Sequence, residues 1–432
     1  MNIKKLFFKY TGLSMFSTIG MSCYVLADTL FIANGVGTLG LTALNLVLPI
    51  YNIIFGIGIM LGTGGATRFS IFMSQDNHKA KDYFFYAIVL GLCFSIPFVI
   101  IGLCFPETIV FLLGGNTEVL EIASLYLRTF IIFTPFFILN HIFVIFIRND
   151  QNPTLASLAM FCGTLFNIIF DYIFIFPCQL GMFGAALATG CSPIVSLCIC
   201  LLHFKKKDNH LSFQRHHICM PYVIDIIKIG IPAFITELSS GIITFAFNKV
   251  IFGIGGNIAI ASYGIICNLA IVVMSLYTGI AQGVQPLMSQ CYGHHDVKGI
   301  SYYLKYSLLL SLFISCLIYG IVCIYPDMII SFFNSEGNIK IIEMTRNGLI
   351  LYFSGFFFAG LNIIYISYFT STQKIQHSFI VSLLRGGVVI IPLVIIFSSL
   401  FSLSGVWISF PISEAMIFII AYLFYKKHQF KV

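Results

Sequence analysis

Apolar windows of about 20 residues, the length an α-helix needs to cross the hydrocarbon core of a bilayer, recur along the whole chain and are separated by short polar segments. Several windows exceed a single crossing, which favours tilted or kinked helices. The pattern predicts an all-α integral membrane protein with twelve transmembrane helices. They are expected near residues 9–33, 43–69, 83–105, 120–147, 156–176, 183–204, 222–254, 258–288, 302–324, 341–369, 377–399 and 404–425.

The composition agrees with this pattern. Of 432 residues, 59% are hydrophobic and only 9% are charged, whereas a soluble domain carries about 25% charged residues. The composition therefore excludes a soluble protein. The formal net charge of +7 does not indicate nucleic-acid binding, because the basic residues cluster between apolar windows.

The basic residues also predict the orientation of the chain. They gather at alternate ends of the windows, and positively charged loops stay in the cytoplasm. We therefore expect both termini in the cytoplasm and an even number of spans. The opposite ends hold few basic residues: Arg128, Lys340 and Arg346. The cytoplasmic set comprises Lys4, Lys5, Lys9, Arg68, Lys79, Lys81, Arg148, Lys205, Lys206, Lys207, Arg215, Lys228, Lys298, Lys305, Lys374, Lys426, Lys427 and Lys431.

The second half of the sequence echoes the first at an offset near 220 residues. Gly35 aligns with Gly255, and Asn140 aligns with Asn362. Such an offset indicates two six-helix halves of the same topology. We expect an N-terminal lobe over residues 1–210 and a C-terminal lobe over 211–432, joined through a basic segment near 205–217.

One pair of polar residues stands out in the fifth window. Asn167 and Asp171 are four residues apart, so on a helix they share one face. A carboxylate inside a bilayer costs several kcal/mol unless it is paired, hydrated or neutralised, and such residues are usually functional. In the repeat alignment Asp171 faces apolar Ile395 or a near neighbour, and Asp28 faces Asn248. Only the first half keeps carboxylates at these places.

Several motifs together give the chain a resemblance to the multidrug and toxic compound extrusion (MATE) transporters, in particular their DinF-like bacterial branch. The resemblance covers essentially the whole chain. The motifs are Asp28-Thr-Leu-Phe-Ile-Ala-Asn-Gly-Val-Gly, Arg148-Asn-Asp-Gln-Asn-Pro153, Asn167-Ile-Ile-Phe-Asp171-Tyr, Gly184-Ala-Ala-Leu-Ala-Thr189 and Gly230-Ile-Pro232.

The resemblance implies two six-helix bundles around a central cleft that opens alternately to each side of the membrane. It implies export of cationic, amphipathic compounds in exchange for Na⁺ or H⁺. It also implies a cation site in the first lobe at Asp28, Asn167, Asp171 and Thr189. Other branches of the family use acidic residues in the second lobe. Glu237 is offset from that pattern, so we expect no second cation site.

The expected topology places these four residues at a similar depth, in the outer half of the first lobe. Carboxylate and carbonyl oxygens suit a hard cation such as Na⁺. A carboxyl group in a low-dielectric environment also binds a proton readily, and more so beside a second carboxylate. These four residues could therefore bind either Na⁺ or a proton. The alternative to an ion site is a structural polar network that joins the helices.

Other polar or pliable residues are further candidates. Glu237 would either contact a cationic substrate or hydrogen-bond to Ser239 and Ser240. Arg385 and Glu414 fall at comparable depth and are expected to form a structural ion pair rather than to contact substrate. Met160 and Met288 are candidate liners of a substrate cleft, for which packing is the competing explanation.

The sequence contains no G-x-x-x-x-G-K-[ST] loop, so we do not expect ATP as the energy source. The leading hypothesis is a secondary multidrug antiporter in the bacterial cytoplasmic membrane. We expect it to be a monomer, not an enzyme, with no cofactor beyond the coupling ion and no metal site beyond a Na⁺ at the four residues. The alternatives are a lipid-linked saccharide flippase, a membrane-embedded enzyme with Asp28 and Asp171 as its dyad, and a channel.

Overall fold

The computed structural model describes residues 3–73, 75, 77–206, 208–211, 219–331 and 339–429, and these residues contain helices and no strands. The first half of the chain forms the first lobe. Its helices are α1 (Ile3–Gly35), α2 (Thr38–Phe72), α3 (Asn77–Cys104), α4 (Pro106–Leu112), α5 (Thr117–Ile131), α6 (Thr134–Asn149), α7 (Pro153–Ile175), α8 (Gly181–Cys200) and the 3₁₀ turn η1 (Leu201–Lys205).

The second half forms the second lobe. Its helices are α9 (Met220–Gly293), α10 (Val297–Ile324), α11 (Pro326–Ser331), α12 (Ile339–Phe353), α13 (Phe356–Ser371), α14 (Ile375–Leu383), the π-helical turn η2 (Leu384–Val388) and α15 (Ile390–Gln429). Backbone breaks divide two of these stretches: Gly256 interrupts α9, and Ser402, at φ 53°, interrupts α15.

The helices account for the twelve expected spans. Nine helical stretches are long and apolar enough to cross a membrane, and two bent helix pairs add two more. One of the nine, Ile375–Lys427, has 53 residues, far more than the roughly 20 that one crossing needs. Because Ser402 breaks this stretch, it supplies two spans. The described residues thus hold twelve spans, and the prediction of an all-α membrane protein is confirmed.

The two halves repeat details that the hydropathy pattern did not predict. The fourth span of each half is bent, by 49° between α5 and α6 and by 42° between α12 and α13. A short helix, α4 or α11, precedes each bent span. Each bent span is also followed, two residues after its last helical residue, by a glutamine with positive φ, Gln151 at 58° and Gln373 at 57°. These shared irregularities support the internal repeat.

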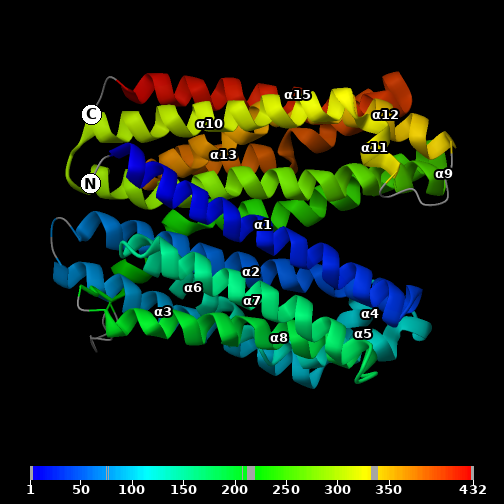
Figure 1. Cartoon of the computed structure of the whole chain (residues 1–432), viewed down its shortest axis with the longest axis horizontal. Helices are drawn as coiled ribbons and strands as arrows, with labels where there is room; N and C mark the ends of the chain where they lie inside the picture. Colours follow the sequence, from blue (N-terminus) through cyan, green and yellow to red (C-terminus); the bar gives the residue numbers. More distant parts are fainter. Residues whose placement is uncertain are drawn as a thin grey trace.

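Figure 1 shows the two lobes side by side, with both termini at the same end of the molecule. We call this the termini end and the opposite one the far end. Each lobe has its own apolar core. The cores interlock near the termini end, because Leu211 and Ile226 pack into the first core while Phe7 and Tyr10 of α1 pack into the second. The exact boundary between residues 210 and 211 stays a prediction.

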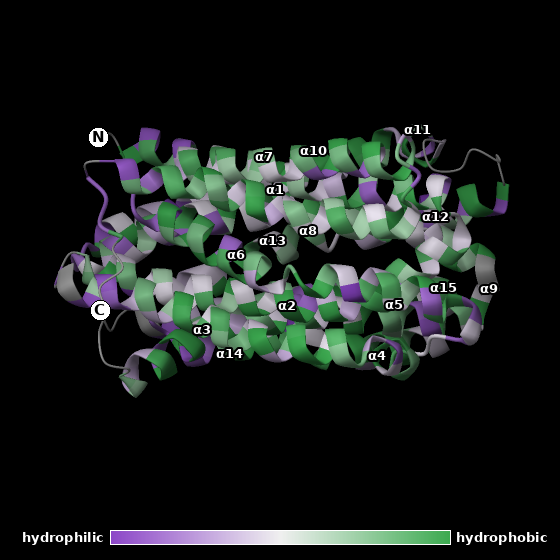
Figure 2. Cartoon of the chain, turned by 90° about the horizontal axis from the view of Figure 1, so that it is seen from below, coloured by the Kyte–Doolittle hydropathy of each residue, from purple (hydrophilic) through white to green (hydrophobic). Residues whose placement is uncertain are grey.

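The lobes approach each other closely near the termini end. A Cβ atom on Gly64 of α2 would lie 2.0 Å from the carbonyl oxygen of Ile226, and one on Gly230 of α9 would lie 1.9 Å from that of Met60. Only glycine permits such backbone contact between helices. In Figure 2, apolar residues cover most of the length of the helices, and hydrophilic residues gather at the termini end. This distribution is what a multi-pass membrane protein requires.

Candidate functional site

The four candidate residues of the first lobe meet inside it. Asp28 comes from α1, Asn167 and Asp171 from α7, and Thr189 from α8. Their exposed fractions are 7%, 1%, 0% and 4%. The Asn167 amide nitrogen Nδ2 donates to Thr189 Oγ1 at 3.3 Å, and the carboxyl groups of Asp28 and Asp171 lie close enough to interact electrostatically. Residues from three helices therefore form one buried polar cluster.

The local sequence explains how α7 presents its pair. Asn152 caps the helix by accepting from the backbone nitrogen of Leu155, and Pro153 occupies its first turn. At 1.5 Å per residue, Asp171 then lies in the part of α7 that approaches the far end. Small residues keep α8 close, since a Cβ atom on Gly163 would lie 3.1 Å from the carbonyl oxygen of Ser192.

This cluster contains buried oxygen atoms without hydrogen-bond donors. Asp28 Oδ1, Asn167 Oδ1 and both carboxyl oxygens of Asp171 are fully buried, and none receives a hydrogen bond from the described residues. A buried acceptor left without a donor costs about 1–3 kcal/mol, and more if it is charged. Four such atoms in one cluster fit a cation or a proton as the missing partner.

A tyrosine that the sequence reasoning missed completes the cluster. Tyr126 of α5 is 4% exposed and lies close enough to Thr189, Asp28 and Asp171 to interact with all three. A pair of tyrosines also lies beside Asp28, with the Tyr24 and Tyr51 hydroxyl oxygens 2.7 Å apart. The chain contains 21 tyrosines, and no spacing or motif distinguishes Tyr126 from the others.

The second lobe has an ion pair in place of a carboxylate pair. Arg385 Nη2 lies 3.0 Å from Glu414 Oε1, and Arg385 Nε donates to both carboxylate oxygens at 3.1 Å. Asn362 Nδ2 donates to Glu414 Oε2 at 2.7 Å and to its backbone oxygen at 2.9 Å. The structure thus brings together Arg385 and Glu414, and Asn362 links them to the tenth span. The arginine supplies the positive charge that the first-lobe cluster lacks.

Glu237 lies where the two lobes meet. A Cβ atom on Gly56 of α2 would be 3.4 Å from Glu237 Cβ, and Tyr51 is near enough to interact with the carboxylate. Ser240 donates to the backbone oxygen of Glu237 at 2.8 Å and not to its carboxylate. The hydroxyl of Ser240 therefore does not form the expected hydrogen bond with the Glu237 carboxylate. The Glu237 side chain is directed to the seam between the lobes.

The two methionines occupy packing positions. Met288 is fully buried in the core of the second lobe in this conformation, and its expected role in lining a substrate cleft stays a prediction. Met160 packs against the first core, and Arg148 Nη2 approaches its sulfur at 3.7 Å. Their hydropathy and flexibility suggested a cleft, but apolar burial accounts for both side chains.

An ion pair joins the lobes near the termini end. Arg68 of α2 places Nη2 2.9 Å from Asp225 Oδ2 of α9 and donates through Nη1 to Gln373 Oε1 at 2.8 Å. Tyr83 donates to the same Asp225 oxygen at 3.1 Å. We call Arg68, Tyr83, Asp225 and Gln373 the latch.

A buried amide network continues the seam beside the latch. Gln285 of α9 donates to Thr67 Oγ1 at 2.9 Å and accepts from Asn149 at 3.2 Å, and Arg148 donates to Gln282 at 2.9 Å. All these interlobe bonds lie toward the termini end, which they hold closed.

A histidine cluster lies at the same end. Asp150 is 1% exposed and binds His203 Nε2 at 2.7 Å and His210 Nδ1 at 2.8 Å. Asp150 also accepts from the backbone nitrogen of His210 at 3.0 Å. These bonds attach His203 and His210, at the start of the segment that connects the two lobes, to Asp150 of the first lobe. His216 and His217, which follow in the same segment, lie outside the described residues.

The comparisons with known proteins bear directly on these features. The MatE family model matches residues 14–173 and again residues 232–396, one match in each lobe. The chain belongs to the MatE family. The resemblance seen in the motifs is thereby confirmed, and the double match follows the internal repeat.

Two relatives share the name multidrug export protein MepA. The one from Staphylococcus aureus strain MRSA252 is 30% identical over 387 residues, covering 87% of this chain and 83% of the relative. The one from Staphylococcus saprophyticus is 28% identical over 384 residues, with the same coverage.

Solved structures show the same fold. A multidrug resistance MATE family transporter in its outward-facing conformation superimposes with a TM-score of 0.93 at 21% identity, covering 99% of this chain and 96% of that chain. A transporter of the same superfamily from Pyrococcus furiosus gives a TM-score of 0.92 at 21% identity, with the same coverage.

Proposed function

We propose that this protein is a proton-coupled antiporter that exports cationic, amphipathic drugs. The proton binds to Asp28 or Asp171. The neighbouring polar side chains, those of Asn167, Thr189 and Tyr126, orient these carboxyl groups. The drug binds in the cleft between the lobes. The relatives named as multidrug export proteins support the substrate class. The main observation in support of the coupling site is that four buried oxygen atoms of the first-lobe cluster receive no hydrogen bond from the described residues.

The proximity of the two carboxyl groups supports a proton as the coupling ion. Two facing carboxylates without a basic partner cannot both stay ionised in a low-dielectric interior, so one of them takes up a proton. Neither Asp28 nor Asp171 has an ion pair with a described basic residue. Na⁺ is the second candidate, because the same carboxyl, amide and hydroxyl oxygens are ligands for a hard cation.

The geometry suggests how proton and drug exchange. The latch and the amide network hold the termini end closed, which leaves the far end as the opening side. The basic residues at the termini end favour a cytoplasmic location for it in a bacterial inner membrane. The protein therefore faces outward here, and protonation of Asp28 or Asp171 changes how α1 and α7 pack in the first lobe. One chain provides both lobes, so a monomer suffices.

The alternatives have less support. A lipid-linked saccharide flippase would need basic residues facing the cleft to bind phosphates. The charged residue placed there in this proposal is Glu237, which is acidic. A membrane enzyme would use Asp28 and Asp171 on a bound substrate, but the relatives are named as export proteins.

Export from cells carrying single variants tests the proposal. Asp28→Asn and Asp171→Asn should abolish drug efflux while the protein remains in the membrane. Asp327→Asn, which alters an exposed aspartate of α11, is the matched control and should retain efflux. Full drug resistance with Asp171→Asn would refute the coupling role.

A further inference from the structure

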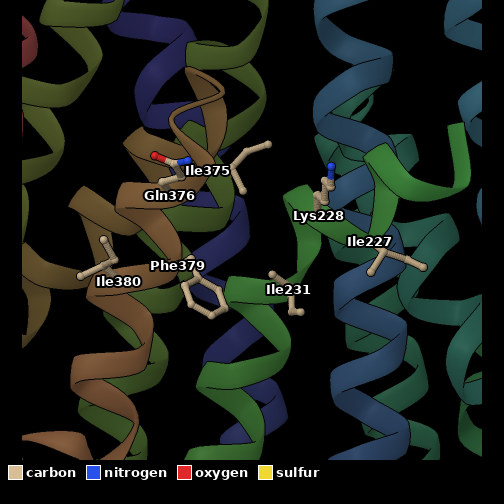
Figure 3. A pocket seen from close by; sticks show the side chains of 7 residues that line it. All are labelled: Ile227, Lys228, Ile231, Ile375, Gln376, Phe379 and Ile380. Atoms are coloured by element: carbon tan, nitrogen blue, oxygen red, sulfur yellow. The ribbon is translucent and has the colours of Figure 1, made fainter. Parts of the chain in front are cut away.

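A groove of ≈ 370 Å³ lies between the start of α9 and α14, away from the first-lobe cluster (Figure 3). Ile231 of α9 and Phe379 and Ile380 of α14 form its apolar walls. Lys228 of α9 and Gln376 of α14 both line its end nearest the termini, with Ile375 between them in the view. Ile380 is 39% exposed on a predicted span, so the groove opens toward lipid.

A close helix contact determines the shape of the groove. Further along, a Cβ atom on Gly386 would lie 2.4 Å from Ser239 Oγ, so η2 and α9 touch there. Gly387 has φ 119°, and this π-helical turn redirects the eleventh span. From that contact the two helices diverge toward the termini end, which leaves a wedge between them.

The wide end of the groove is suited to an anion. Lys228 is exposed and has no ion pair or hydrogen bond among the described residues. The side chain of Lys374 does not cap α14, and the backbone amides of Ile375 and Gln376 have no acceptor within the described part of the chain. A lysine opposite the free amides of a helix N-terminus is a site for a phosphate group.

We propose that this groove binds an anionic phospholipid of the leaflet at the termini end. Its phosphate lies between Lys228 and the first turn of α14, and one acyl chain lies along Ile231, Phe379 and Ile380. The apolar walls below the cation select a lipid over a soluble phosphate, because they would otherwise be left without an apolar partner. Basic pockets between transmembrane helices are known to hold such headgroups.

The bound lipid would act on the latch. Asp225 precedes Lys228 by three residues, which is one helical turn, and Gln373 precedes Ile375 by two. Asp225 and Gln373 are the two acceptors of Arg68. A lipid that joins the starts of α9 and α14 therefore holds both acceptors in place and favours closure of the termini end.

A second groove along α9 provides a matched control. A second groove, of ≈ 540 Å³, lies between α9 and α15 near the far end and includes Lys249, Ser398 and Ser399. Both serines lie inside α15, where their amides serve the helix. Lys249 is thus a lysine beside a groove without a helix N-terminus opposite it.

Native mass spectrometry of the purified full chain, titrated with phosphatidylglycerol or phosphatidylcholine, tests the site. The unmodified protein should bind phosphatidylglycerol preferentially. Lys228→Gln should weaken this binding about fivefold, the usual effect of one lysine at an anionic surface. Lys249→Gln should leave it unchanged, Lys228→Arg should retain it, and Ile231→Trp, which fills the groove, should weaken it.

Equal binding of the two lipids, or unchanged phosphatidylglycerol binding by both Lys228→Gln and Ile231→Trp, would overturn the proposal. Displacement of the lipid by inorganic phosphate would also overturn it, because the site would then be one for a soluble anion. The experiment measures binding without transport, so its outcome does not depend on the coupling role of Asp171.

Discussion

Arg68 in the first lobe and Asp225 in the second lobe form an ion pair of 2.9 Å across the seam between the lobes. Both side chains are partly exposed, at 17% and 34%, so the pair is expected to contribute about 1 kcal/mol at most. The pair matters because it joins the two lobes, and it can form only while the termini end is closed.

Breaking the latch should therefore shift the balance between conformations. We predict that Arg68→Gln increases hydrogen–deuterium exchange in the first turns of α9 and α14, because Asp225 and Gln373 lose their shared donor. Arg346→Gln is the matched control, because it breaks the exposed pair with Asp327 near the far end. Identical exchange in the two variants at the start of α9 would contradict the latch.

The ion pair of the second lobe should behave as a structural unit. Arg385 and Glu414 are only 7% and 6% exposed at their side chains. Removing one partner leaves a buried charge, so Arg385→Met or Glu414→Gln should destabilise the protein by about 3–5 kcal/mol. The double variant Arg385→Met with Glu414→Met should recover much of that loss, as measured by thermal unfolding in detergent. A double variant less stable than both single variants would argue against this role.

Tyr126 should tune the first-lobe site. Tyr126→Phe removes a hydroxyl that lies near Thr189, Asp28 and Asp171 and should shift the ion dependence of efflux about fivefold, the effect of losing one polar interaction of about 1 kcal/mol. Tyr172→Phe on α7 is the control, because Tyr172 is 53% exposed. An unchanged ion dependence in Tyr126→Phe would remove this tyrosine from the site.

Glu237 should favour charged drugs. Its carboxylate lies at the seam between the lobes, so Glu237→Gln should weaken efflux of a monocationic drug while leaving a neutral analogue of similar size unaffected. The comparison requires concentration-dependent efflux of both compounds from the same cells. An equal loss for both compounds would indicate that Glu237 acts on packing rather than on charge.

Much of the architecture was readable from the sequence because it depends on patterns that are local or repeated. The apolar windows predicted the spans, and the Asn167–Asp171 spacing predicted a shared helix face. The grouping of Asp28 with Asp171 came from the family resemblance and the expected depth together.

Other features depend on tertiary geometry and were not predictable from the sequence. Tyr126 joins the cluster from α5, a different helix from those of the other four residues. Met288 is fully buried, although a flexible apolar side chain would also suit a cleft. Arg68 and Asp225 are 157 positions apart in the chain, counted from residue numbers 68 and 225, and nothing local in the sequence links them.

The central claim is that Asp28 and Asp171 couple proton movement to drug export. Drug transport by purified protein in vesicles, driven first by a pH gradient alone and then by a Na⁺ gradient alone, tests it most directly. We predict transport under the pH gradient, no stimulation by the Na⁺ gradient, and loss of the pH-driven transport in Asp171→Asn. Transport by Asp171→Asn at the unmodified rate, or transport driven only by Na⁺, would contradict the account.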